Sequence, residues 1–219
     1  MTDTADLTLD ELRVTLAPAI AEAAAFDGWG EAGIASAARA RGVDPAVARL
    51  AFPGGAMDAI AAWIASVDQA MAEAHSAESL AQFPVRERIR RLVVFRLEAV
   101  RHNEEALRRA MSVMAAPQNA ARALKLGWQS ADAMWRLAGD RATDYNHYTK
   151  RAILAGVYAA TLAVFVGDES EGKAETFAFL DRRLEGILRF EKAKARLLRP
   201  ADEHFSFARL LGRLRYPAA

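Results

Sequence analysis

The sequence predicts an all-α protein built as a helical bundle. Apolar residues recur at helical spacing, the breaks between apolar segments are short, and no stretch alternates as a β-strand does. Residues 152–166 carry no charge. A helix that is apolar all round is buried in a core or a membrane, and this run is shorter than the roughly 20 residues that span a bilayer. We therefore expect residues 144–166 to form the central buried helix, with Gly156 leaving room for a neighbouring helix or a flat ligand.

Composition limits the classes of protein. The chain has 219 residues, 53% of them hydrophobic, which suffices for one large domain or two small ones. Its 29 basic and 28 acidic residues give no overall attraction to nucleic acid or membrane. The absence of cysteine excludes disulfides and thiolate metal sites. The N-terminus resembles neither a secretory signal nor a transit peptide, which favours a bacterial cytoplasmic protein.

Three helices are expected before residue 55. The first spans about Thr8 to Phe26, where Thr8 and Glu11 have the spacing of a capping box and Pro18 is expected to kink the helix or leave a weak turn. A second helix ends at Gly42. The dipeptide Asp44-Pro45 then begins a short third helix, because proline is favoured at the first helical position.

This arrangement resembles the N-terminal three-helix unit of TetR-type repressors. DNA binding is not expected, because residues 1–64 contain four bases and nine acids, a net charge of −5, and the third helix offers only Arg49 to reach a base edge. We therefore predict a domain at 1–55 with this topology that does not bind nucleic acid. The whole fold is predicted to be a TetR-like bundle of about nine helices.

The bundle domain is predicted at 56–195. Its helices are expected at 56–74, 85–102, 104–116, 117–138, 144–166 and from 173 to about 195. The helix at 85–102 carries six arginines among its apolar residues. We interpret it as an amphipathic helix whose arginine face is solvated. The alternative is a basic patch that binds phosphate or anionic lipid.

Several separated motifs resemble the lipid-binding accessory proteins of coenzyme Q (ubiquinone) biosynthesis, a family with a TetR-like fold. They are residues 50–55 (LAFPGG), 117–120 (PQNA), 133–140 (AMWRLAGD), 144–158 (DYNHYTKRAILAGVY), 179–183 (FLDRR) and 190–194 (FEKAK). The resemblance covers about residues 26–194. It implies an isoprenoid-binding cavity, no chemistry of the protein's own, service to a di-iron hydroxylase, and homodimers through the last long helices.

Two sets of site residues follow. The family's partner-facing patch falls on Met134, Leu137, Asp144, Tyr145, His147 and Tyr148. The family commonly has tryptophan where this chain has His147. A cavity for an apolar tail needs large apolar side chains, and the candidates are Trp63, Ile64, Leu124, Trp128, Ile153, Val157, Leu162, Phe177 and Leu180. The same residues would also suit a solid core.

The pair formed by Asp144 and His147 is a poor metal site. The two are spaced as D-x-x-H, but no second carboxylate–histidine motif accompanies them. An N-cap aspartate and a surface histidine explain them better. We expect no metal.

Residues 196–219 are predicted to be a linker and an amphipathic helix. Residues 205–219 carry three arginines and no acid. The apolar and basic pattern is that of a helix lying in an anionic membrane interface, formed by Phe205, Phe207, Arg209, Leu210, Leu211, Arg213 and Leu214. A helix docked on its own domain fits the pattern nearly as well, and the resemblance favours the membrane.

No catalytic motif is apparent in the sequence. It shows no phosphate-binding glycine loop, nucleophile elbow or di-iron ligand set, so we expect neither enzymatic activity nor a cofactor. The functional hypothesis is a homodimeric lipid presenter. It docks from the bacterial cytoplasm on the inner membrane, binds a prenylated quinone precursor and hands it to the di-iron demethoxyubiquinone hydroxylase. The alternative is a TetR-type regulator that senses an apolar small molecule.

Overall fold

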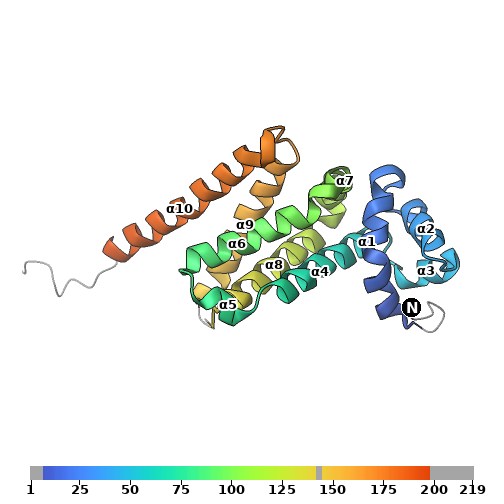
Figure 1. Cartoon of the computed structure of the whole chain (residues 1–219), viewed down its shortest axis with the longest axis horizontal. Coiled ribbons are helices and arrows are strands. Elements are labelled where there is room, and N and C mark those ends of the chain that lie inside the picture. Colours follow the sequence, from blue (N-terminus) through green and yellow to red (C-terminus); the bar gives the residue numbers. More distant parts are fainter. Residues whose placement is uncertain (1–6, 142–144, 198–219) are drawn as a thin grey trace, which may run out of the picture. The chain divides into compact units, whose positions relative to one another are not determined.

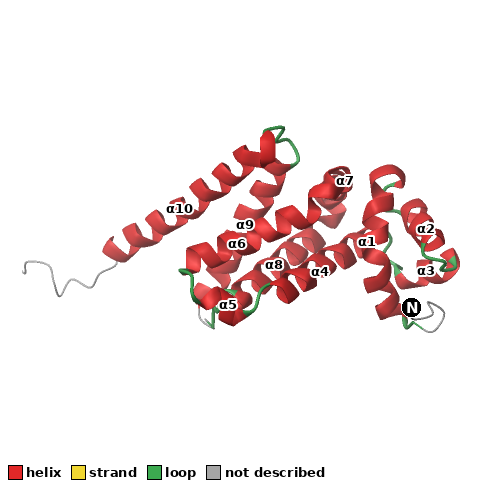
Figure 2. Cartoon of the chain, viewed as in Figure 1, coloured by secondary structure: helices red, strands yellow, loops and turns green. Residues whose placement is uncertain are grey.

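The computed structural model describes residues 7–141 and 145–197, with side chains in 7–141 and 146–187. Its two compact units are residues 1–181 and 182–219. The described residues form α-helices and short 3-10 turns without any strand (Figures 1 and 2), which confirms the predicted all-α class. The helices are α1 (Leu9–Asp27), α2 (Glu31–Ala40), α3 (Pro45–Ala51), α4 (Ala56–Ala74), α5 (Ala77–Ala81), α6 (Val85–Val100), α7 (Glu104–Ala115), α8 (Ala120–Leu137), α9 (Tyr145–Phe165) and α10 (Ala174–Leu197).

The first helices begin where their capping residues predict. Thr8 Oγ1 accepts from the Glu11 backbone N–H at 3.3 Å, and Glu11 Oε2 accepts from the Thr8 N–H at 2.9 Å, which completes the capping box. Asp44 Oδ1 accepts from the Ala46 N–H at 2.8 Å and starts α3. Helix α1 continues through Pro18, so the proline does not divide it.

A tryptophan pair joins the first three helices to the bundle. Trp29 follows α1 and Trp63 lies on α4; both are buried, with ring centroids 5.1 Å apart. Trp29 Nε1 also donates to the Ala106 carbonyl of α7 at 2.8 Å, which satisfies the polar end of this buried ring. Helices α1, α4 and α7 therefore share one core. The domain boundaries at 55 and 195 stay predictions.

The turn between α1 and α2 requires a glycine at position 33. A Cβ added to Gly33 would lie 1.9 Å from the Gly28 carbonyl oxygen, so the helix and the turn could no longer approach as closely. We expect Gly33→Ala to lower the free energy of unfolding by about 1–3 kcal/mol, measured by urea denaturation. Gly127→Ala on α8 is the control, because a Cβ there meets nothing within 4 Å. It should stabilise by up to about 1 kcal/mol. A Gly33→Ala protein as stable as the parent would contradict this role.

The prediction that α9 is buried all round is wrong. Its buried residues repeat every three or four positions and form one face: Arg151, Leu154, Tyr158, Thr161 and Phe165. The opposite face is exposed at Ala152, Gly156, Ala159 and Ala163. Within the described part of residues 7–181, helix α9 packs on α8 and α6, and these neighbours cover one side of it. The missing charge reflects small, uncharged residues on the outer face rather than burial.

The arginines of α6 are largely engaged within the fold. Arg90 Nε donates to Asp181 Oδ1 at 2.7 Å, and Arg91 Nε donates to Glu87 Oε1 at 2.9 Å. Arg88 donates to the backbone carbonyls of Ala81 and Phe83, at and just after the end of α5, and to that of Ala138 at the end of α8. Helix α5 has five residues, and the sequence did not predict it. These partners do not support the alternative of an open basic patch on α6.

Among the described residues, no single helix is both long and apolar enough to cross a membrane. Helices α3 and α4 taken together are long and apolar enough, but the chain bends by 77° at the break between them.

Candidate functional site

The candidate site is the end of the α8–α9 pair where α9 begins, and a buried arginine organises it. Arg151 is only 2% exposed. Its Nε donates to Asp132 Oδ1 at 2.6 Å, and its Nη1 donates to Asp140 Oδ2 at 3.0 Å and to the His147 carbonyl at 3.1 Å. Lys150 Nζ donates to the other oxygen of Asp140 at 2.7 Å. The arginine thus ties α8, the turn after it and the first turn of α9 together.

The pKa of Asp140 lies below its ordinary value. Burial raises the pKa of this carboxyl, but hydrogen bonds from Lys150 and Arg151 and their positive charges lower it by more. Asp140 therefore stays ionised at neutral pH. The buried guanidinium keeps a charged partner, which burial of a cation requires.

Three aromatic rings gather on the surface next to this network. Trp128 of α8 lies 6.4 Å from the His147 ring and 6.0 Å from the Tyr148 ring, and His147 and Tyr148 meet edge to face at 5.1 Å. Tyr148 is 61% exposed, and Leu124, one turn before Trp128, is 76% exposed. We call Leu124, Trp128, His147 and Tyr148 the aromatic patch. Apolar and aromatic side chains exposed together are typical of interaction sites.

The backbone under the patch is also fixed. Trp135 Nε1 donates to the Lys150 carbonyl at 3.0 Å, and the Lys150 ammonium lies 5.3 Å from the Trp135 ring centroid. The first turn of α9 is therefore held on α8 by a ring hydrogen bond as well as by ion pairs.

The structure separates the predicted partner-facing residues. Tyr148 is exposed, and His147 and Leu137 are half-buried. Met134 is fully buried, which contradicts a partner-facing position, because it lies on the inner side of α8. Asp144 and the side chain of Tyr145 lie outside the described residues.

The predicted lipid-lining residues do not share one environment. Trp63 and Leu180 are buried. The half-buried ones are Ile64, Trp128, Ile153, Val157, Leu162 and Phe177. Leu124 faces solvent and belongs to the aromatic patch, which contradicts a cavity-lining position for it. The predicted membrane-binding residues, Phe205, Phe207, Arg209, Leu210, Leu211, Arg213 and Leu214, lie outside the described residues.

A second buried ionic cluster lies inside the bundle, and the sequence analysis missed it. Arg96 of α6 is 2% exposed. It donates through Nη1 to Asp68 of α4 and through Nη2 to Ser130 Oγ of α8 at 3.1 Å, and its guanidinium lies 4.9 Å from the Tyr158 ring centroid of α9. Four helices therefore meet at one charge pair. Arg96 is therefore not part of the solvated arginine face that was predicted for this helix.

The described residues hold no group of three or more His, Asp or Glu side chains placed to bind a metal ion.

The helix order and packing define a TetR-like helical protein. The crystal structure of the TetR transcriptional regulator from Nitrosomonas europaea aligns with a TM-score of 0.63, over 80% of this chain and 96% of that chain, at 23% identity. At this identity the likeness shows the fold alone. It confirms the predicted TetR-like bundle.

Within this fold, residues 120–191 match the COQ9 family model, and this segment spans α8, α9 and most of α10. The protein named ubiquinone biosynthesis protein COQ9, mitochondrial, is 42% identical in Rattus norvegicus and 39% identical in Homo sapiens, each over 80 residues and 36% of this chain. A probable Dictyostelium discoideum coq9 protein is 24% identical over 123 residues, which are 56% of this chain and 40% of that protein.

These relatives confirm the family resemblance and correct one prediction. The matched region is about a quarter of the length of the rat and human proteins, at 26% and 25%. Their names are those of mitochondrial proteins, which contradicts the expected bacterial cytoplasmic location.

Proposed function

We propose that this chain is a non-catalytic accessory protein of ubiquinone biosynthesis that binds a prenylated quinone precursor and presents it to the di-iron demethoxyubiquinone hydroxylase. The observation that carries the proposal is the aromatic patch. Its Leu124 and Tyr148 are exposed, the buried Arg151 network lies behind it, and all four of its residues lie within the segment that matches the COQ9 family. A preformed aromatic surface binds a protein partner at low entropic cost, because its side chains are already ordered.

The lipid part of the proposal rests on large apolar side chains around α9. Ile153, Val157 and Leu162 are half-buried on a helix without charge after Arg151. An isoprenoid tail needs such surface and few polar groups. Organic extracts of gently purified protein should contain a prenylated quinone or precursor at close to one per chain, measured by mass spectrometry against an identically purified control protein. A protein that stays empty after incubation with such lipids would argue against the carrier role.

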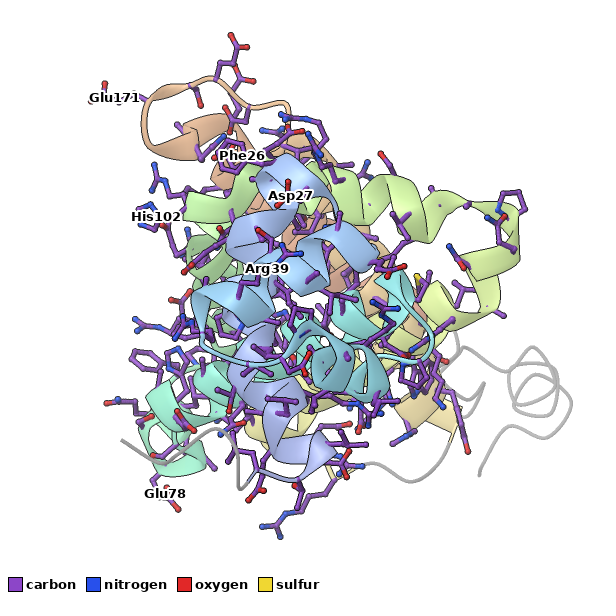
Figure 3. All side chains as sticks on the ribbon, turned by 90° about the vertical axis from the view of Figure 1, so that its right-hand side faces the viewer. Phe26, Asp27, Arg39, Glu78, His102 and Glu171 are labelled. Atoms are coloured by element: carbon purple, nitrogen blue, oxygen red, sulfur yellow. The ribbon has the colours of Figure 1, made fainter. Side chains whose placement is uncertain are left out.

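We expect Tyr148→Ala to weaken binding to the hydroxylase of the same organism at least tenfold, measured by surface plasmon resonance. The change removes the most exposed ring of the patch, and central aromatic residues dominate binding energies at interfaces. Phe26→Ala is the matched control. Phe26 is 84% exposed at the end of α1 (Figure 3), it belongs neither to the aromatic patch nor to residues 120–191, and its loss should leave the affinity unchanged. Equal affinities for both variants would contradict docking through the patch.

Homodimer formation and membrane docking belong to the same proposal. The uncharged outer face of α9 supports self-association, because small residues allow two helices to approach closely; sedimentation equilibrium measures it. Deleting residues 205–219 is the test of membrane docking, with reduced binding to anionic liposomes as the supporting outcome.

A TetR-type regulator is the alternative function. Helix α3 exposes Val47 and Leu50, and Arg49 Nη2 is paired with Glu31 Oε1 at 3.0 Å, so this helix is poorly equipped to read base edges. Specific, salt-dependent binding to a DNA fragment would favour the alternative.

A further inference from the structure

A cleft of about 430 Å³ lies between α1, α4 and α8, and the proposed function does not use it. Its walls come from the first helix and from two helices of the bundle. The aromatic patch is not among its lining residues, so the cleft is a separate feature of the fold.

The lining of the cleft is mixed: alanines of α4 and Val14 form its apolar part, and Ser66 and Gln69 of α4 add uncharged polar groups. Helix α4 contributes Ala61, Ala62 and Ala65, and α1 contributes Val14, which is 55% exposed. Alanine side chains leave the surface of a helix thin, so a slender apolar group can approach closely. The volume falls within the range of small-molecule sites.

Two ion pairs line the cleft and balance its charge. Arg122 Nη2 of α8 donates to Asp58 of α4, and Arg13 Nη1 donates to Asp10 at 2.7 Å on α1. Asp58 also accepts from the Gly54 backbone N–H at 2.5 Å. Each carboxylate thus has a cationic partner. A charged ligand would have to compete with an existing pair, whereas an uncharged one would not.

One of these cations can also hold a polar group of a ligand. A guanidinium carries five N–H donors in a fixed plane, and Nη2 is the nitrogen through which Arg122 binds Asp58. The Arg122 side chain is 41% exposed at the rim of the cleft. A carbonyl or ether oxygen can accept a hydrogen bond there while the ion pair stays intact.

We propose that this cleft binds an uncharged amphipathic small molecule, with its alkyl part against the alanines of α4 and an oxygen acceptor on Arg122. Helix α1 belongs to the N-terminal three-helix unit, whereas α4 and α8 belong to the bundle. The bound molecule would therefore contact both the three-helix unit and the bundle. A ligand that binds only the folded protein raises its apparent stability.

The test uses three probes with the same alkyl chain: methyl octanoate, octanoate and octylamine. Methyl octanoate should give saturable amide shifts in α1 and α4 by NMR, with a Kd at least fivefold lower than that of either charged probe. Saturation with shifts confined to other helices, or an equally low Kd for a charged probe, would overturn the proposal.

Matched variants locate the site. Ala65→Trp places a large ring in the cleft at an exposed position and should weaken methyl octanoate binding at least tenfold. Ala72→Trp is the control, because Ala72 is exposed two turns further along α4 and does not line the cleft. Arg122→Leu should weaken binding at least threefold if its guanidinium holds the ester. Unchanged Kd values in both cleft variants would also overturn the site.

Discussion

Arg151→Met is expected to lower the free energy of unfolding by about 3–5 kcal/mol. The arginine is almost fully buried between Asp132 and Asp140, and the change leaves both carboxylates without its charge and the His147 carbonyl without a donor. Removing one partner of a buried ion pair costs more than the pair contributes, because the remaining charge stays poorly solvated. Urea denaturation followed by circular dichroism measures the loss.

Lys150→Met provides the matched control for Arg151. Lys150 binds the same Asp140, but its side chain is 40% exposed, against 2% for Arg151. Its loss should cost at most about 1 kcal/mol, as for exposed ion pairs. If both variants lost the same free energy of unfolding, the burial of Arg151 would not be the cause of its larger expected effect. Because Arg151 also holds the first turn of α9, its variant should weaken the proposed binding to the hydroxylase even under conditions in which it remains folded.

Asp68→Leu is expected to lower the free energy of unfolding by a similar amount, about 3–5 kcal/mol, because it leaves the Arg96 guanidinium in the core without its carboxylate. Burial raises the pKa of Asp68, even though the charge of Arg96 and the hydrogen bonds from Ser130 and Arg96 lower it, so the carboxylate itself is costly to bury. Because burying the two charged groups is itself costly, replacing both with apolar residues can compensate for the loss of the ion pair.

The double variant Asp68→Leu/Arg96→Met should recover most of the lost stability, to within about 1–2 kcal/mol of the parent, since apolar side chains of similar volume often replace a buried ion pair without loss. Urea denaturation of both single variants and the double variant completes the cycle. Additive losses would contradict direct coupling between the two residues.

The local features of the fold could be predicted from sequence, because neighbours along the chain determine them. The capping box at Thr8 and the Asp44-Pro45 helix start satisfy backbone groups within three residues, and both form as expected. The five residues of α5 are too few for helical periodicity to reveal them, and that helix was missed.

The face that each helix buries was harder to predict. In α6, Arg96 lies between Leu92 and Val100, within the apolar stripe rather than beside it. Its position at four-residue spacing from these two was a signal of burial that its charge obscured. For α9 the error was the opposite one, because residues predicted to be buried are exposed. Small uncharged residues fit either environment, and only the packing on α8 and α6 shows which side is covered.

The candidate site was predicted in part for the same reason. His147 and Tyr148 lie next to each other in sequence and open α9, so their common position followed from the family motif. Met134 and Leu124 both belong to α8, one buried and one exposed, and a list of apolar residues could not separate them. The role of Arg151 could not be predicted, since its partners lie on α8 and in the turn that follows it.

The contact between Trp29 and Trp63 provides an intrinsic spectroscopic probe of the packing between the first helices and the bundle. Two indole rings 5.1 Å apart and tilted by 38° couple their electronic transitions, and this coupling produces an exciton signal in circular dichroism that separated tryptophans lack. One ring precedes α2 and the other lies in the middle of α4, so the signal depends on the first helices staying packed on the bundle. Detachment of those helices would abolish it before the helical signal fell, which makes partial opening of the chain visible without any label.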